Sequence, residues 1–115
     1  EGPMPQTRFV LQKAIDLGVV AISKSTPAKQ SELNKIIGES YFNLKEYAKA
    51  VTYLEGYKGK NGKWTNTDYY QLGFAYYQQK DFQNAISQFN KIINYGTKQE
   101  GQRIELDEET AKYFG

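Results

Sequence analysis

The chain has 115 residues, of which 39% are hydrophobic and 24% are charged, a composition typical of one small globular domain and not of a disordered segment. Its formal net charge of +2 is too small for a protein that coats nucleic acid or an anionic membrane. Cysteine and histidine are both absent, which excludes disulfides and thiolate metal sites and removes the commonest general base. We therefore expect no catalytic residues, no metal and no cofactor. No apolar run is long enough to span a membrane.

The first half of the chain predicts three helices. The first covers residues 8–25. Thr26 then precedes Pro27, which suits the first position of a helix, and this second helix continues to about Leu44. A third helix is expected from Glu46 to Tyr57, before the glycine-rich loop GKNGK.

The second half predicts another helix pair. Thr65 is a candidate N-cap, and Asp68 completes a capping box three residues later. Lys80 and Asp81 mark a tight turn, after which a second helix carries an apolar stripe made of Phe82, Ala85, Ile86, Phe89, Ile92 and Ile93.

The pattern predicts that this helix ends at Gly96. Residues 96–103 are expected to form a flexible connection. Asp107 then caps a final helix, with Glu108 and Glu109 in its first turn.

The two pairs are copies of one pattern, because residues 36–54 match residues 71–89 at an offset of 35 without a gap. Gly38 and Gly73 occupy equivalent mid-helix positions, where glycine costs roughly 1 kcal/mol relative to alanine. Such glycines are tolerable where another helix approaches closely. We expect Ala50 and Ala85 to face these glycines, with Tyr41 and Tyr76 packed beside them.

This pattern resembles the tetratricopeptide repeat family. The second copy reads Tyr69-x2-Leu72-Gly73-x2-Tyr76…Ala85-x3-Phe89. The first reads Asn34-x2-Ile37-Gly38-x2-Tyr41…Ala50-x3-Leu54, and both lack the family's tryptophan and terminal proline. The resemblance implies an all-α fold of helix-turn-helix repeats stacked as a short right-handed solenoid.

Residues 1–115 are then one domain cut from a longer array. We interpret residues 8–25 as the second helix of a preceding partial repeat, 27–58 as repeat one and 66–95 as repeat two. Residues 107–115 would start a third repeat or form a capping helix. The composition is similar to that of large bacterial repeat proteins, several of them associated with the cell envelope. The periplasm and the cytoplasm both remain open as locations.

The resemblance also implies a binding surface, because the first helices of stacked repeats line a concave side that usually holds a partner's peptide. The residues mapped to partner binding are Lys35, Glu39, Phe42, Asn43, Tyr70, Gln71, Phe74, Tyr77 and Gln78, with Glu32 and Thr67 also on that side. Four of them are aromatic rings that core packing does not explain: Phe42, Tyr70, Phe74 and Tyr77. Tyr69, Tyr76, Phe82 and Phe89 fit the family's core positions.

The sequence bears on three alternatives. Neighbouring repeats could cover the aromatic face, making the chain a spacer or an end-to-end self-assembly segment. Lys58, Lys60 and Lys63 beside Trp64 could hold a nucleic-acid strand, although a solvated loop with a locally packed tryptophan is the preferred interpretation and no nucleic acid is expected. A chaperone's carboxylate tail is an unsuitable ligand, because Glu39 and Gln71 replace the asparagines that such family members use.

Overall fold

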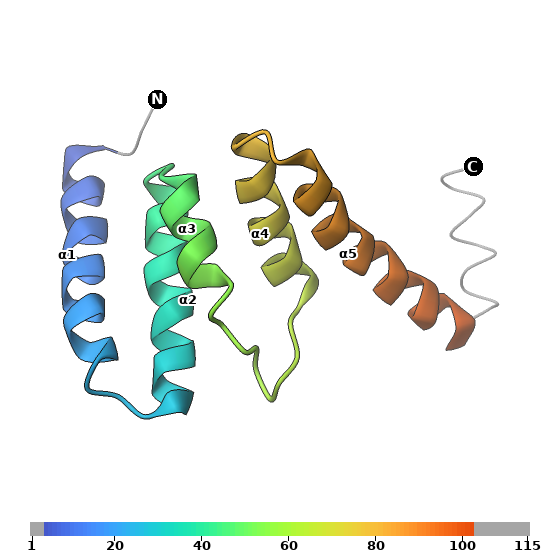
Figure 1. The fold of residues 1–115 in the computed structure, drawn as a ribbon, viewed down its shortest axis with the longest axis horizontal. Helices are drawn as coiled ribbons and strands as arrows, with labels where there is room; N and C mark the ends of the chain where they lie inside the picture. The colour runs from blue at the N-terminus through green and yellow to red at the C-terminus, as the bar shows by residue number, and fades with distance from the viewer. Residues whose placement is uncertain (1–3, 103–115) are drawn as a thin grey trace.

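The structure, a computed structural model, describes the backbone of residues 4–102 and the side chains of residues 4–92. Within this range five α-helices lie side by side in sequence order (Figure 1): α1 (Pro5–Ile22), α2 (Pro27–Asn43), α3 (Tyr47–Leu54), α4 (Asn66–Gln78) and α5 (Phe82–Gln102). Each helix packs mainly against its neighbours in the sequence. The predicted all-α fold class is confirmed.

Side-chain caps fix where the helices begin. The Thr26 hydroxyl accepts a hydrogen bond from the Lys29 backbone N–H at 3.3 Å, at the start of α2. At the start of α4, the Thr65 hydroxyl accepts from the Asp68 backbone N–H at 3.2 Å, and the Asp68 carboxylate accepts from the Thr65 N–H at 2.9 Å. The predicted capping box is therefore present.

Helix α1 differs from its predicted range of 8–25 at both ends, beginning at Pro5 and ending at Ile22. Proline is compatible with the first turn of a helix, which explains the earlier start. At the other end the Ser25 hydroxyl donates to the carbonyl of Ala21 at 2.7 Å, and the Gln30 amide donates to that of Ile22 at 3.0 Å. These side chains satisfy the final carbonyls of α1, so the helix ends before the predicted residue 25.

The same turn closes α2 and α4. Lys45 and Lys80 both adopt a left-handed backbone conformation with φ of 64°. After α2, the N–H groups of Lys45 and Glu46 donate to the carbonyls of Phe42 and Tyr41, each at 2.9 Å. The bonds of Lys80 to Tyr77 and of Asp81 to Tyr76 repeat this arrangement 35 residues later. Both turns are Schellman motifs in which lysine replaces the usual glycine.

Close helix contacts occur at the mid-helix glycines, as predicted. A Cβ atom added at Gly38 would lie 2.8 Å from Leu54 Cγ, and one added at Gly73 would lie 2.5 Å from Phe89 Cε1. Gly18 of α1 makes a similar contact, since its added Cβ would lie 2.8 Å from Ile37 Cγ1. Each helix interface α1–α2, α2–α3 and α4–α5 therefore contains a glycine that lets a larger side chain approach the opposite backbone.

The side chains nearest to Gly38 and Gly73 are not the predicted ones. Leu54 and Phe89 fill these positions, whereas Ala50 and Ala85 were expected there. Ala50 and Ala85 lie one turn earlier on α3 and α5 and are buried as well. In an α-helix each side chain points back towards the N-terminus of the helix. The space opposite a glycine is therefore filled by a residue further along the partner helix than the residue whose Cα lies level with that glycine.

Helix α5 corrects two further predictions. It continues through Gly96 to Gln102, so Gly96 does not end it and residues 96–102 do not form a loop. A single glycine costs only about 1 kcal/mol in a helix interior, and residues 97–100, which follow it, are compatible with helix. The predicted helix at 107–115, with its cap at Asp107, lies outside the described residues.

The apolar stripe of α5 is only partly buried. Ala85 is 2% exposed, whereas Phe82 is 51% and Ile86 is 57% exposed, so the assignment of Phe82 to the core is wrong. Among the described helices α5 packs substantially against α4 alone, which covers one side of the stripe and leaves the other side uncovered.

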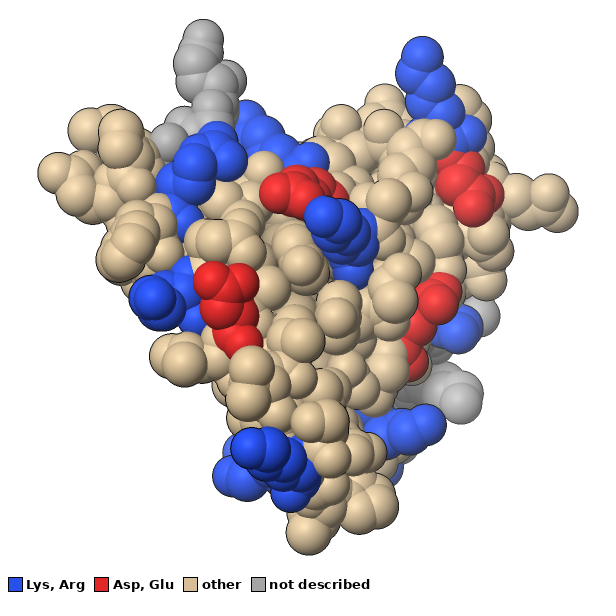
Figure 2. Space-filling view, turned by 60° about the vertical axis from the view of Figure 1, so that its left-hand side comes forward, with Lys and Arg blue, Asp and Glu red and all other residues tan. Residues whose placement is uncertain are grey.

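Charged side chains are interspersed on the face drawn in Figure 2, and neither sign gathers into one continuous patch there. Within residues 4–102, no helix is both long enough and apolar enough to cross a membrane.

Asp68 links the two helical hairpins. Its side chain is 5% exposed and, besides forming the capping box, its carboxylate lies 3.3 Å from the Lys35 ammonium of α2. Burial alone would lower the pKa of Lys35, but the Asp68 carboxylate, with smaller contributions from Glu39 and Tyr57, raises the pKa above its usual value. Helices α2 and α4 are thereby joined by an ion pair between adjacent repeats.

Replacing Gly38 by alanine should lower the free energy of unfolding by about 1–3 kcal/mol through overpacking. This loss is expected although alanine has a higher helix propensity than glycine. The added methyl group would meet Leu54 Cγ and the Leu54 backbone nitrogen, at 2.8 and 2.9 Å. Urea denaturation monitored by the fluorescence of Trp64, the one tryptophan of the chain, measures the loss. In the Gly38→Ala/Leu54→Ala double variant the loss should be smaller than the sum of the single losses. Strict additivity would contradict this contact.

Replacing Asp68 by alanine should lower the free energy of unfolding by about 1–2 kcal/mol, because the Thr65 N–H loses its acceptor in the capping box while the bond from the residue 68 N–H to the Thr65 hydroxyl remains. Replacing Lys35 by methionine should cost less than about 1 kcal/mol, because the Lys35 side chain is 33% exposed and solvent screens its ion pair. Equal losses in the two variants, measured by urea denaturation, would show that the ion pair and not the cap carries the effect.

Candidate functional site

Aromatic rings from all four of the helices α2–α5 form one connected cluster, here called the aromatic cluster. Phe74 of α4 lies at its centre. The Phe74 ring centroid lies 5.8 Å from that of Phe42, 6.0 Å from Tyr47, 5.9 Å from Tyr70 and 6.4 Å from Tyr77. The four rings predicted as a partner-binding set therefore do come together, with Phe74 touching the other three.

The structure adds three rings to the predicted four. Tyr47 contacts Phe42 at 5.6 Å, Phe82 contacts Tyr77 at 5.5 Å, and Phe89 contacts Tyr70 at 6.1 Å. The Phe42–Tyr47 and Tyr77–Phe82 pairs are equivalent positions of the two repeats, so the 35-residue offset contained the signal for both. Sequence reasoning missed this signal because it assigned Phe82 to the core and gave Tyr47 no role.

Exposure divides the aromatic cluster into a half-buried base and an open surface. Phe42 and Phe74 are half-buried, whereas Tyr70 and Tyr77 are each 52% exposed. The predicted amide neighbours Asn43 and Gln78 are exposed, and Gln71 is half-buried. The surface offers aromatic faces, tyrosine hydroxyls and neutral amides, and therefore suits hydrogen bonding combined with apolar contact.

The two charged residues of the predicted set have a different environment. The Lys35 ammonium pairs with Asp68 and lies 4.9 Å from the centroid of the Tyr57 ring. Glu39 is half-buried and helps to raise the pKa of Lys35. Because Lys35 already has a carboxylate partner, it serves the junction between the two repeats and is not a free charge for a ligand.

Trp64 packs into the protein, in agreement with the preferred interpretation of the glycine-rich loop. Its ring lies 6.2 Å from that of Tyr57 and 5.2 Å from that of Tyr69, and its indole N–H donates to the Tyr57 carbonyl at 2.8 Å. These two neighbouring rings reduce the indole surface on which a nucleotide base could stack.

Within the described residues, no three carboxylate side chains gather into a group that could hold a metal ion.

The comparisons with known proteins agree with the repeat seen in the sequence. A family model described as tetratricopeptide repeat matches residues 36–61 and residues 69–95. The first match covers the second part of α2 together with α3, and the second covers most of α4 and the first part of α5. Neither the curated proteins nor the solved structures gave a match to this chain. The two matched segments contain the two copies related by 35 residues, and residues 36–95 of the chain therefore carry two tetratricopeptide repeats.

Proposed function

We propose that this chain is a non-catalytic protein-interaction scaffold that binds a partner's peptide through the aromatic cluster. Tetratricopeptide repeats generally serve as protein-interaction scaffolds. The observation that carries the proposal for this chain is the exposure of Tyr70 and Tyr77, each 52% exposed, around the half-buried Phe74. Exposed aromatic rings grouped around a packed centre are typical of interface hot spots.

A comparison of the two repeats supports a role beyond packing. Positions needed for packing are alike in both copies, as in Gly38 and Gly73. Tyr70 and Phe74, however, correspond at the 35-residue offset to Lys35 and Glu39, which are charged. If the rings served only the packing within one repeat, the first repeat would need them too. The aromatic surface is thus a specific property of the second repeat and its junction with the first.

The chemistry of the aromatic cluster indicates the kind of peptide that it would hold. Asn43, Gln71 and Gln78 surround the rings with neutral donors and acceptors that can bond to a peptide backbone. The rings offer contact area for aliphatic or aromatic side chains at little cost in conformational entropy. A neutral peptide with one or two large apolar side chains fits this surface best.

The Tyr70→Ala/Tyr77→Ala double variant should lose peptide binding while keeping its helical content, because both rings are half exposed and Phe74 stays in place. Peptides selected from a phage-displayed library on the native chain can be titrated against the native and variant proteins. The expected loss is on the order of 2 kcal/mol or more, as for a hot-spot residue. The matched control, Phe9→Ala/Leu17→Ala, removes two exposed apolar side chains from α1 and should bind normally. Normal binding by the Tyr70/Tyr77 variant would refute the proposal.

Stacking within a longer array is a second candidate function, favoured by the apolar surface of α1. Four apolar side chains of this helix are each at least 60% exposed: Phe9, Val10, Leu17 and Val20. Together with Phe82 and Ile86 on α5, they leave apolar side chains uncovered at both ends of the described helix row. Solenoid ends of this kind associate unless they are capped.

End-to-end stacking predicts that the average mass measured by sedimentation velocity rises with protein concentration. The Phe9→Gln/Leu17→Gln variant should sediment as a monomer under conditions in which the native chain associates, because its α1 surface no longer gains from burial. A native chain that stays monomeric at millimolar concentration would rule out this second function. It would leave the peptide-binding proposal unaffected.

A further inference from the structure

A second surface lies on the other side of α4 from Tyr70, Phe74 and Tyr77. Here the end of α3, the glycine-rich loop, α4 and α5 enclose an open pocket of about 760 Å³. Tyr69 and Leu72 of α4 line it, and helical periodicity places them on a different face from Tyr70 and Phe74. The full lining consists of Glu55, Tyr57, Lys58, Gly62, Lys63, Trp64, Tyr69, Leu72, Gln88 and Lys91.

The loop that forms one wall is held in place by α2. The Asn34 amide donates to the Gly56 carbonyl at 3.3 Å, and the Ser31 hydroxyl accepts from the Lys58 backbone N–H at 2.8 Å. Gly59 has φ of 88°, and a Cβ atom there would lie 2.5 Å from the Lys63 carbonyl carbon, so only glycine fits this turn. A wall fixed by these contacts reduces the entropy that a ligand must offset on binding.

Positive charge dominates the pocket rim. Lys58, Lys63 and Lys91 contribute ammonium groups, and within the described side chains none of the three forms an ion pair. Glu55 is the one carboxylate of the lining, and it already accepts a hydrogen bond from the Tyr76 hydroxyl. Burial and this bond raise the pKa of Tyr76, so the hydroxyl keeps its proton and remains a donor to Glu55.

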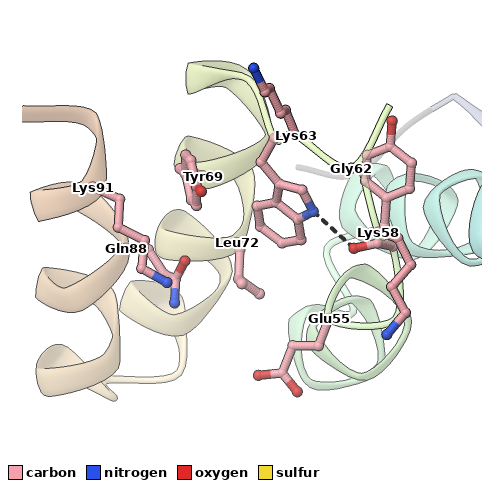
Figure 3. Close-up of a pocket in the computed structure, with 10 residues that line it drawn as sticks. Glu55, Lys58, Gly62, Lys63, Tyr69, Leu72, Gln88 and Lys91 are labelled. Carbon is pink, nitrogen blue, oxygen red and sulfur yellow. Dashed lines mark hydrogen bonds between the residues drawn. The ribbon is translucent and has the colours of Figure 1, made fainter. Parts of the chain in front are cut away.

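The geometry points to a binding site for an acidic peptide segment with an apolar side chain. We infer this from two features. Lys58, Lys63 and Lys91 stand on different sides of the pocket, with Leu72 between them (Figure 3), and the indole of Trp64 also lines the pocket. Separated cations match several carboxylates along a chain better than one compact anion. The half-buried indole of Trp64 receives the apolar side chain, since Leu72 itself is only 3% exposed.

A nucleic-acid strand fits this pocket less well than an acidic peptide. Strand binding relies on free aromatic faces for base stacking, whereas Tyr57 and Tyr69 flank Trp64. In addition, the Lys91 ammonium lies over the Tyr69 ring, 5.6 Å from its centroid, and this cation–π contact occupies that ring.

The fluorescence of Trp64 in the full chain gives a direct test, because this indole lines the pocket. A short synthetic peptide with one leucine flanked by glutamates should change the emission saturably, and added salt should weaken its binding. The Lys58→Gln/Lys63→Gln/Lys91→Gln variant should bind it roughly tenfold more weakly or worse. The Lys13→Gln/Lys24→Gln/Lys29→Gln variant has the same change in net charge on α1, α2 and the turn between them, and should bind it like the native chain.

Several results would overturn the inference. The acidic peptide could fail to bind the native chain. A peptide with glutamine in place of glutamate could bind the native chain as tightly as the acidic peptide does, or the Lys58→Gln/Lys63→Gln/Lys91→Gln variant could bind the acidic peptide as tightly as the native chain does. Binding of a thymidine oligonucleotide through Lys58, Lys63 and Lys91 without binding of the peptide would identify a nucleic-acid site instead. The Tyr70→Ala/Tyr77→Ala variant should bind the acidic peptide normally. The two proposals are therefore tested independently: either the acidic-peptide site or the peptide site at the aromatic cluster can be refuted while the other is supported.

Discussion

The contact of a glycine in one helix with a large side chain of the next sets the geometry of this protein. Leu54 against Gly38 and Phe89 against Gly73 bring each second helix close to its first helix. This closeness has a cost, because glycine disfavours helix by roughly 1 kcal/mol, and the interdigitated packing offsets it. The separation of α4 and α5 in turn determines which rings of α4 meet α5, and hence where the aromatic cluster and the pocket lie.

The repeat imposes symmetry on packing and leaves the surface free to differ. Turns, glycine contacts and the Phe42–Tyr47 and Tyr77–Phe82 ring pairs all recur at an offset of 35 residues. The surface positions do not recur, since Lys35 pairs with Asp68 whereas its equivalent, Tyr70, contacts Phe74. One architecture thus carries a charged junction in its first repeat and an aromatic surface in its second.

Much of this structure could be predicted from local sequence chemistry. The Thr65–Asp68 capping box and the mid-helix glycines follow from short-range patterns, whereas the four central rings were implied by the resemblance to the repeat family. The extension of α5 beyond Gly96 could not be predicted, because a lone glycine weakens a helix without forbidding it. The exposure of Phe82 depends on which helices cover α5, and the pairing of Lys35 with Asp68 depends on how two hairpins dock, so neither is encoded in a local pattern.

The packing of each helix mainly against its sequence neighbours also determines how the fold forms and opens. Contacts between neighbours in the sequence close short loops, so the hairpins can form quickly and independently. In such a linear array the end helices can unfold while the central ones remain folded. The Phe42–Phe74 contact, by contrast, joins α2 to α4 across two hairpins. The aromatic cluster is therefore complete only after the hairpins have docked, and a partner that binds it stabilises their docked arrangement.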